Sequence, residues 1–359
     1  MKLLRNIMMI LFFSLLIMVI GVCTFYNYSI SPVDKKSNEE IEVVIPNGAS
    51  TTEIGSILKE KDLIHSKNIF RVYCYIYKVN DLKAGTYKLK KSMKLESIVE
   101  VLKEGNTYNP EEIKITFNEG INMRKIASII AKNTNNTEED VYNLLKDESY
   151  IDSLIKDYWF ITEEIKNSNI YYSLEGYLNC DTYNFKNKDV TVKEIFKKLL
   201  DEKGKILDKY KKEIEGSNYT PHQILTLASM VELEGVTDSD RAGIASVFYN
   251  RLNRKMSLGS DVTSYYANKV EMSSRDLTTT EYNLENPYNT RTASMAGKLP
   301  VGPVSNPSEA SIKAVLFPQK SDYLYFVSDK NRKVYFSKTY AEQDATIKKL
   351  KQEGKWFEW

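Results

Sequence analysis

The chain has 359 residues, with 50 basic and 48 acidic side chains and a formal net charge of +2. A nucleic-acid partner would require a concentrated basic face, and this balance of charge argues against one. The sequence contains two histidines, three cysteines and no CxxC pair, so a zinc site or a serine–histidine triad is disfavoured. We therefore expect any chemistry to depend on carboxylates, without a metal or cofactor.

The N-terminal segment is long enough to span a bilayer. Lys2 and Arg5 precede a stretch from Ile7 to Tyr26 that is almost wholly apolar, and a spanning helix needs about 20 such residues. Residues 1–30 are therefore predicted to form a cytoplasmic tip and an uncleaved transmembrane anchor. Because the basic flank stays inside, the bulk of the chain is expected outside the plasma membrane.

The segment after the anchor leaves one alternative open. Residues 29–31 read Ser-Ile-Ser and could serve as a poor cleavage site, so a cleaved signal peptide competes with the anchor. Residues 31–40 are interpreted as a short polar linker. The rest of the chain is long enough for two domains with separate cores.

The next part of the chain predicts a small α+β unit over residues 41–108. A strand at 41–45 is followed by two helical stretches, the second continuing through Phe70, then by an alternating strand at 82–89 and a helix at 95–102. A similar strand and helix begin at Ile113, and two charged helical regions follow. We expect residues 109–359 to form a larger mixed α/β domain, so the fold class is α+β.

One predicted helix carries the strongest catalytic candidate. Thr220, Pro221 and Gln223 form a helix start signal, and Gly235 is a natural stop. The residues between are apolar around most of the circumference, so the helix should be buried. Glu232 shares a side with apolar neighbours, which would favour the protonated carboxyl that a general acid needs. The alternative is that Glu232 and Glu234 both face solvent at the helix end.

Seven local motifs occur in an order that is characteristic of one family. They are LKAGTYKL (82–89), LEGYLNCDTYNF (174–185), LASMVELEG (227–235), VFYNRLNRKMSLGSDVTSYY (247–266), PYNTR (287–291), LPVGPVSNPSEASIKAVLFP (299–318) and YLYFV (323–327). Together they resemble the endolytic murein transglycosylases of bacteria, also called MltG or YceG-like proteins. The resemblance implies a LysM-like module at 41–108 and a catalytic domain at 109–359. It also implies cleavage of the bond between N-acetylmuramic acid and N-acetylglucosamine within peptidoglycan strands, leaving a 1,6-anhydro end.

The resemblance also implies roles for individual residues. Glu232 occupies the place of the family's catalytic glutamate. Glu175 is assigned to substrate positioning or to tuning Glu232, with a purely structural turn as the alternative. The other candidates for substrate binding are Tyr177, Asp181, Asp261, Tyr288 and Asn289. For the tyrosines the alternative is ordinary packing, and for Asn289 it is an Asx turn.

This sequence departs from the family pattern in two of these motifs. Asn179 and Cys180 replace an aromatic residue and a proline, and Gly259 replaces a glutamine. The first change puts the shape of that loop in doubt, and the second removes a side-chain contact.

Two other functions compete with the lytic transglycosylase. One is a catalytically silent scaffold that binds the wall and recruits wall synthases. The other is a hydrolytic muramidase that uses Glu232 together with Glu175 or Asp261, because a conventional glycosidase needs two carboxylates. The expected partners are peptidoglycan strands, the lipid bilayer through Ile7 to Tyr26, and wall synthases.

Overall fold

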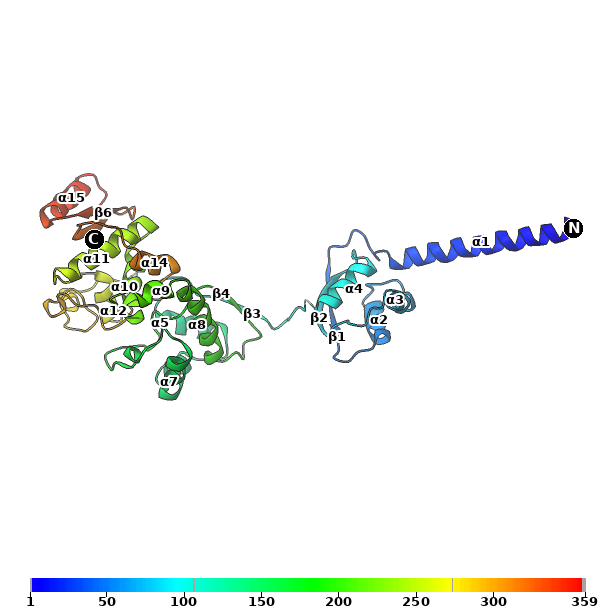
Figure 1. Cartoon of the computed structure of the whole chain (residues 1–359), viewed down its shortest axis with the longest axis horizontal. Helices are drawn as coiled ribbons and strands as arrows, with labels where there is room; N and C mark the ends of the chain where they lie inside the picture. The colour runs from blue at the N-terminus through cyan, green and yellow to red at the C-terminus, as the bar shows by residue number, and fades with distance from the viewer. Residues whose placement is uncertain (1, 106, 273, 357–359) are drawn as a thin grey trace. The chain divides into compact units, whose positions relative to one another are not determined.

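The computed structural model describes residues 2–105, 107–272 and 274–356. The chain divides into two compact units, Met1–Glu111 and Glu112–Trp359, which are coloured along the sequence in Figure 1. Cys74 and Cys180 are both buried free thiols and belong to different units.

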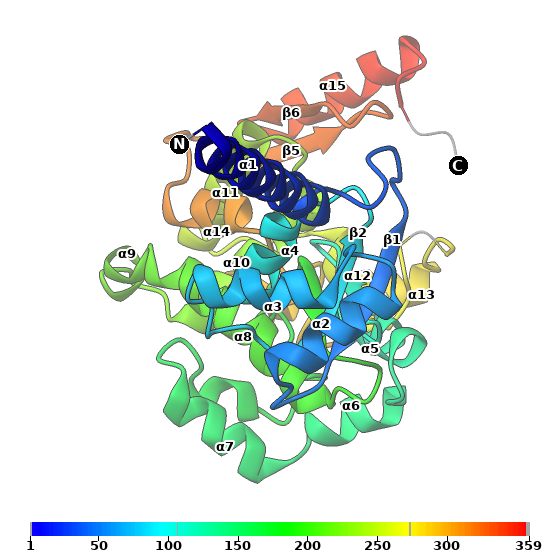
Figure 2. The ribbon, with the colours of Figure 1, turned by 90° about the vertical axis from the view of Figure 1, so that its right-hand side faces the viewer.

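The first unit consists of one long helix followed by a strand, two helices, a strand and a helix, in the order expected from the sequence. The elements are α1 (Lys2–Ile30), β1 (Glu40–Ile45), α2 (Thr51–Glu60), α3 (Lys67–Ile76), β2 (Gly85–Lys90) and α4 (Leu95–Glu104). The two strands pair antiparallel, with Val43 opposite Tyr87, and their inward side chains form a core with the three short helices. Helices α2 and α3 pack side by side (Figures 1 and 2).

Within the described residues, α1 is the helix that is long and apolar enough to cross a membrane. Its end is joined closely to the small unit. Ile30 packs against the core of that unit, and the backbone N–H of Asp34 donates to the carbonyl of Lys91 at 3.1 Å. Residues 31–40 were expected to form a polar linker. Their first part instead contacts the small unit, because Ile30, just before them, packs against its core.

The described part of the second unit is mostly helical, with two small antiparallel sheets. Its strands are β3 (Ile113–Thr116), β4 (Thr182–Phe185), β5 (Tyr325–Ser328) and β6 (Val334–Ser337). Its α-helices are α5 (Met123–Asn133), α6 (Glu138–Leu144), α7 (Glu148–Asp157), α8 (Val192–Asp208), α9 (Lys211–Glu215), α10 (Pro221–Glu234), α11 (Asp238–Asn253), α12 (Asp261–Ala267), α13 (Thr279–Tyr282), α14 (Glu309–Leu316) and α15 (Tyr340–Gln352). Two 3-10 turns, Glu163–Lys166 and Ala293–Met295, complete it.

Two features of this unit position the candidate site. Helix α10 packs against α11 and α14, and its body from Ile224 to Val231 is buried. The pairing of β3 with β4 places the turn after β3 beside the loop before β4, and the N–H of Phe117 donates to the carbonyl of Asp181 at 3.0 Å. The end of α10, the start of α14 and these two turns meet in one region.

Candidate active site

Helix α10 carries Glu232 into this region, and the sequence signals that start and stop the helix are all used. Thr220 and Gln223 form a reciprocal capping box, Pro221 occupies the first turn, and the backbone turns extended at Gly235. These contacts satisfy N–H groups at the helix start. The helix is buried along its apolar body, as expected, and Glu232 is half-buried in the last turn.

One oxygen of Glu232 is held by three donors. Oε2 accepts hydrogen bonds from the backbone N–H of Ser308 at 3.0 Å, from the Ser308 hydroxyl, and from the Ser311 hydroxyl at 2.6 Å. Ser308 is the N-cap of α14, so the carboxylate lies at the positive end of that helix. The expectation of apolar surroundings is wrong at this point, because the polar partners come from a distant segment that the helical wheel of α10 does not reveal.

The second oxygen of Glu232 lies toward a glycine. Within the described residues, the hydrogen bonds of this carboxylate all go to Oε2. A Cβ added to Gly120 would come within 3.4 Å of Cγ and 4.0 Å of Oε1 of Glu232. Gly120 has a φ of +76°, a conformation that glycine adopts without strain. A turn without a side chain therefore leaves space beside Oε1.

Charged groups surround Glu232 on the side of the β3 turn. Glu119 is exposed, and partial desolvation, followed by the negative charge of Glu232, raises the pKa of its carboxyl; Asp181 adds to the shift. Two cations act on Glu119, Arg241 of α11 and Lys203 of α8. Lys203 is fully buried and donates to the carbonyl of Pro307 at 2.6 Å. Burial lowers the pKa of Lys203 to about 8, against the opposing charges of Cys180, Glu232 and Glu119.

Glu175 lies beneath this site, in the protein interior. Its side chain is 1% exposed. Oε2 accepts from the N–H of Met123 and the hydroxyl of Tyr266, both at 2.9 Å, and Oε1 accepts from the Asn306 side-chain amide at 3.0 Å. Burial raises the pKa of Glu175 to about 7. The side chain is enclosed by protein groups, so the role it can have is positional.

Asn306 connects Glu175 to the turns around Glu232. Its Oδ1 accepts from the N–H groups of Gly176 and Leu178, each at 3.0 Å. Its backbone carbonyl accepts from Gly120 N–H, and its own N–H donates to Ile121 O, both at 2.9 Å. One side chain thus holds three turns together, and two residues further on the chain reaches Ser308.

Three other residues that the sequence suggested as substrate contacts are also buried in the protein. Tyr177 is fully buried, and its hydroxyl shares a 2.8 Å hydrogen bond with Nδ1 of His222. Tyr288 is fully buried, and its hydroxyl accepts from the N–H of Tyr171 at 3.3 Å. Asn289 is fully buried and uses both ends of its amide on protein groups; one of these contacts, from the N–H of Arg291 at 3.2 Å, is an Asx turn.

Asp181 and Asp261 are exposed, but they lie in different environments. Asp181 belongs to the acidic group around Glu119. Asp261 forms an ion pair with Arg291 at the start of α12. It lies near Glu234, which points away from Glu232 because the two are about 200° apart around the helix.

Glu234 is not the solvent-facing helix-end carboxylate that the sequence allowed. It is half-buried, and its Oε1 accepts from the Ser260 hydroxyl at 2.7 Å. Burial raises the pKa of Glu234 to about 7; the Ser260 hydrogen bond lowers it, and the Asp261 charge raises it further.

Comparison with known proteins identifies the family. The YceG-like family model matches residues 43–349. The chain belongs to the YceG-like family. Over 337 residues it is 36% identical to a Bacillus subtilis protein named endolytic murein transglycosylase, covering 92% of this chain and 91% of the relative. A Streptococcus pneumoniae protein of the same name is 34% identical over 333 residues, and the match spans 60% of that longer relative.

A solved structure also matches the YceG-like chain. It is a crystal structure of a protein from Listeria monocytogenes whose title calls it YceG-like. The two are 36% identical with a TM-score of 0.61, and the match covers 86% of this chain and 99% of the other.

Several groups around Glu232 in this YceG-like chain were not predicted from the sequence. They are Glu119, Lys203, Asn306, Ser308 and Ser311. A signal for the serines was present, because Ser308 followed by Ser311 resembles a helix start. For Lys203 no local signal existed, since it occurs in a helix with many exposed lysines.

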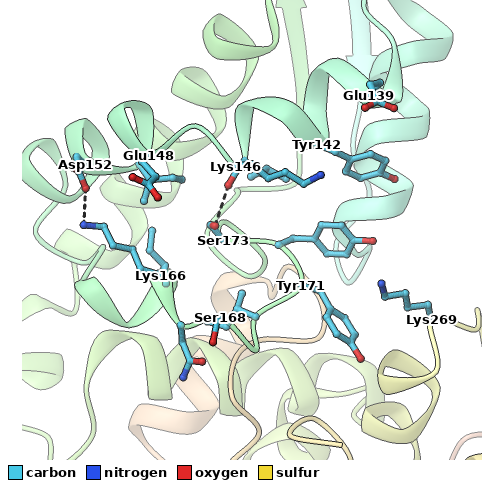
Figure 3. A pocket seen from close by; sticks show the side chains of 16 residues that line it. Glu139, Tyr142, Lys146, Glu148, Asp152, Lys166, Ser168, Tyr171, Ser173 and Lys269 are labelled. Carbon is cyan, nitrogen blue, oxygen red and sulfur yellow. Dashed lines mark hydrogen bonds and ion pairs between the residues drawn. The ribbon is translucent and has the colours of Figure 1, made fainter.

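A separate hollow of about 790 Å³ lies elsewhere in the second unit. Figure 3 shows Tyr142, Tyr171 and Lys269 on one side of it and Glu148, Asp152 and Lys166 on the other. None of its lining residues hydrogen-bonds Glu232. The Tyr171 ring contacts Tyr266 and Tyr288 behind it, so its wall is continuous with the packing around Glu175.

Proposed function

We propose that this YceG-like chain is a lytic transglycosylase that cuts within peptidoglycan strands, with Glu232 as its general acid and base. The observation that carries the proposal is the asymmetry of the Glu232 carboxyl. Oε2 is fixed by Ser308 and Ser311, while Oε1 lies toward the turn at Gly120. A carboxyl held by one oxygen can exchange a proton through the other without losing its orientation. The names of the relatives supply the class of substrate.

In the first step of the proposed reaction, the glycosidic bond breaks. Glu232 gives its proton to the oxygen that links N-acetylmuramic acid to N-acetylglucosamine, and the bond from that oxygen to the anomeric carbon breaks. The leaving strand then ends in a hydroxyl. Positive charge develops on the muramic acid ring, and the carboxylates of Glu232 and Glu119, whose charges interact, provide nearby negative charge.

In the second step, the sugar closes on itself. The ionised Glu232 takes the proton from the 6-hydroxyl of the muramic acid, whose oxygen bonds to the anomeric carbon. The product is a 1,6-anhydro ring, no water is consumed, and Glu232 regains its proton. One carboxyl thus serves both steps, which fits a site in which Glu175 is buried and Asp261 is paired with Arg291.

The supporting residues have positional roles in this proposal. Glu175, Tyr266 and Asn306 hold the turns at Gly120 and Ser308. Tyr177, Tyr288 and Asn289 pack the interior behind them. Asp181 is the sequence candidate that is exposed near Glu119 and could contact sugar hydroxyls directly. The small unit keeps its assignment as a LysM-like module, with glycan binding or spacing as its role.

A hydrolytic muramidase is the second candidate, and one observation favours it. Glu119 is a second carboxylate close enough to Glu232 for their charges to interact, and it could activate a water molecule. This pair replaces the pairing of Glu232 with Glu175 or Asp261 that the sequence suggested. In a wall-bound scaffold without activity, by contrast, the ordered hydrogen bonds of Glu232 would have no function.

The location follows from α1. We infer that it anchors the chain in the plasma membrane with the N-terminus in the cytoplasm, so that both units face the wall. Association with wall synthases also stays a proposal.

Mass spectrometry of digested sacculi tests this function. Purified full-length protein should release fragments that end in 1,6-anhydro-muramic acid, one water lighter than hydrolysis products. Fragments of full mass would support the muramidase instead, and intact strands would support the scaffold.

A further inference from the structure

Val72, Tyr75 and Ile76 lie on one exposed face of helix α3 of the first unit, and Tyr77 follows as the C-cap of the helix. Val72, Tyr75, Ile76 and Tyr77 are 44%, 86%, 57% and 59% exposed, and we call these four residues the α3 patch. The opposite side of the same helix, with Phe70 and neighbouring residues, is buried in the core. Single exposed apolar residues are ordinary, but a contiguous group of them marks a surface that contacts something other than water.

The α3 patch lies beside the end of α1. The two helices pack against each other, and Tyr26 interacts with Tyr77. Two residues further on, the Tyr28 ring lies 4.3 Å from the ring of His65. Because Ile30 also packs into the core of the unit, the position of α3 relative to the end of α1 is fixed by several contacts.

The length of α1 sets the depth of the patch. The apolar stretch from Ile7 to Tyr26 rises about 30 Å as a helix, which is the thickness of the hydrocarbon core. Tyr26 therefore lies at the outer edge of that core, and Tyr77 lies at the same level. Figure 1 shows α2 and α3 on the side of the unit from which α1 extends, with β1 and β2 behind them, and Figure 2 shows the same from the end of α1.

The composition of the segment around the patch fits a lipid surface. Residues 67–78 include Lys67, Arg71 and Lys78 and no acidic residue. Tyrosines are enriched at the boundary between lipid and water, where the ring is apolar and the hydroxyl remains hydrated. Basic side chains beside them favour the anionic headgroups of the leaflet.

We propose that the α3 patch docks onto the outer surface of the bilayer, with Tyr75 and Ile76 among the headgroups. The small unit then contacts the membrane surface directly and is not separated from it by a flexible linker. This inference depends on α1 spanning the bilayer, as in the proposed function, but not on the chemistry of Glu232. A partner protein or a second copy of the chain is the competing occupant, and the experiment separates it from lipid.

The test uses the full chain in lipid nanodiscs that contain anionic phospholipid. A nitroxide is attached at Tyr75→Cys in a Cys23→Ser background, where the two remaining cysteines are buried. Val44→Cys, 55% exposed on β1, is the matched control on the other side of the unit, and Ile17→Cys reports the anchor. Collision with oxygen and with a water-soluble nickel chelate gives the depth of each label.

The expected result is a Tyr75 label at headgroup depth, a Val44 label in water and an Ile17 label near the bilayer centre. A Tyr75 label as exposed to the nickel chelate as the Val44 label overturns the proposal. So does a Tyr75 label that is shielded from both oxygen and nickel, because protein would then cover the patch. An Ile17 label outside the bilayer overturns the anchor and the docking together, and leaves the chemistry of the second unit unaffected.

Discussion

The side-chain amide of Asn306 donates a hydrogen bond to Oε1 of Glu175 at 3.0 Å, across 131 residues of sequence. The contact joins the turn at Gly176 to the turn that leads to Ser308, whose N–H and hydroxyl hold Glu232. The buried carboxylate of Glu175 is thereby connected through the backbone to Glu232, the proposed acid, and this connection supports the positional role proposed for Glu175.

Replacing Glu232 tests the general acid directly. Glu232→Gln keeps the size and an acceptor for Ser308 and Ser311 but cannot transfer a proton. The rate of strand cleavage should fall by about 10²–10⁴ or more, because one group serves both steps. Fragment release by mass spectrometry measures the rate, and circular dichroism checks the fold. Glu215→Gln, on the exposed surface of α9, is the control and should keep wild-type activity. Glu234→Gln would be a poor control, because Glu234 is half-buried and accepts a hydrogen bond from Ser260. Near wild-type cleavage by Glu232→Gln would show that another residue is the acid.

Gly120 offers a test with a matched control. Gly120→Ala places a methyl group against Cγ of Glu232 in a backbone conformation with φ of +76°, and Gly48→Ala has the same strain at φ of +77° with nothing within 4 Å. Both should lose about 1–2 kcal/mol of unfolding free energy in their own unit. Only Gly120→Ala should lose strand cleavage, by about tenfold or more, because its methyl group fills the space beside Oε1 that the reacting oxygen is proposed to occupy. Equal activity of the two variants would mean that this space is not used.

The pH dependence of stability should report the buried carboxylate. Burial raises the pKa of Glu175 from 4.5 to about 7, so the folded state holds a proton that the unfolded state has lost in this interval. The unfolding free energy should therefore fall as pH rises from about 4.5 to about 7, by at most about 3 kcal/mol from this group.

Glu175→Gln should flatten that dependence in urea unfolding at pH 5 and pH 8. It should also cost about 1–3 kcal/mol at pH 5, since the amide cannot accept from all three of its present donors. The cost should be smaller at pH 8, where the wild type has itself lost stability by ionising the buried carboxyl. Glu234→Gln should remove a separate contribution with the same sign, because the pKa of Glu234 is also raised to about 7. An unchanged slope in both variants would contradict the assignment.

Lys203 should give the reaction an alkaline limit. It is a buried cation beside Glu119 and Glu232, and its pKa is lowered to about 8. As pH rises through about 8 the lysine loses its proton, and Glu119 and Glu232 lose its positive charge. For Glu119 this is one of two cations that act on it, the other being Arg241. Wild-type kcat should fall there, whereas Lys203→Met should have a lower kcat and no such limb. Lys205→Met, on the exposed side of the same helix, should keep the wild-type profile. If kcat of Lys203→Met still falls above about pH 8, a group other than Lys203 causes that fall.

The features that sequence could predict are those encoded locally. Helix α10 was defined by its cap, its apolar body and Gly235, and the order of elements in the first unit followed from alternating and helical spacing. The environment of Glu232 was not encoded locally, because Ser308 and Ser311 approach from α14. The burial of Glu175 depends likewise on Tyr266 and Asn306, which lie far along the chain.

The hydrogen bonds of Glu232 can form only late in synthesis of the chain, because their donors lie far along the sequence. Glu232 leaves the ribosome well before Ser311, which follows it by 79 residues. If Glu232 is the acid, as proposed, an unfinished chain that ends before α14 has the acid but not the hydroxyls of Ser308 and Ser311 that orient it. On the proposed mechanism, a chain truncated before α14 should therefore be unable to cleave glycan strands even if the rest of it folds.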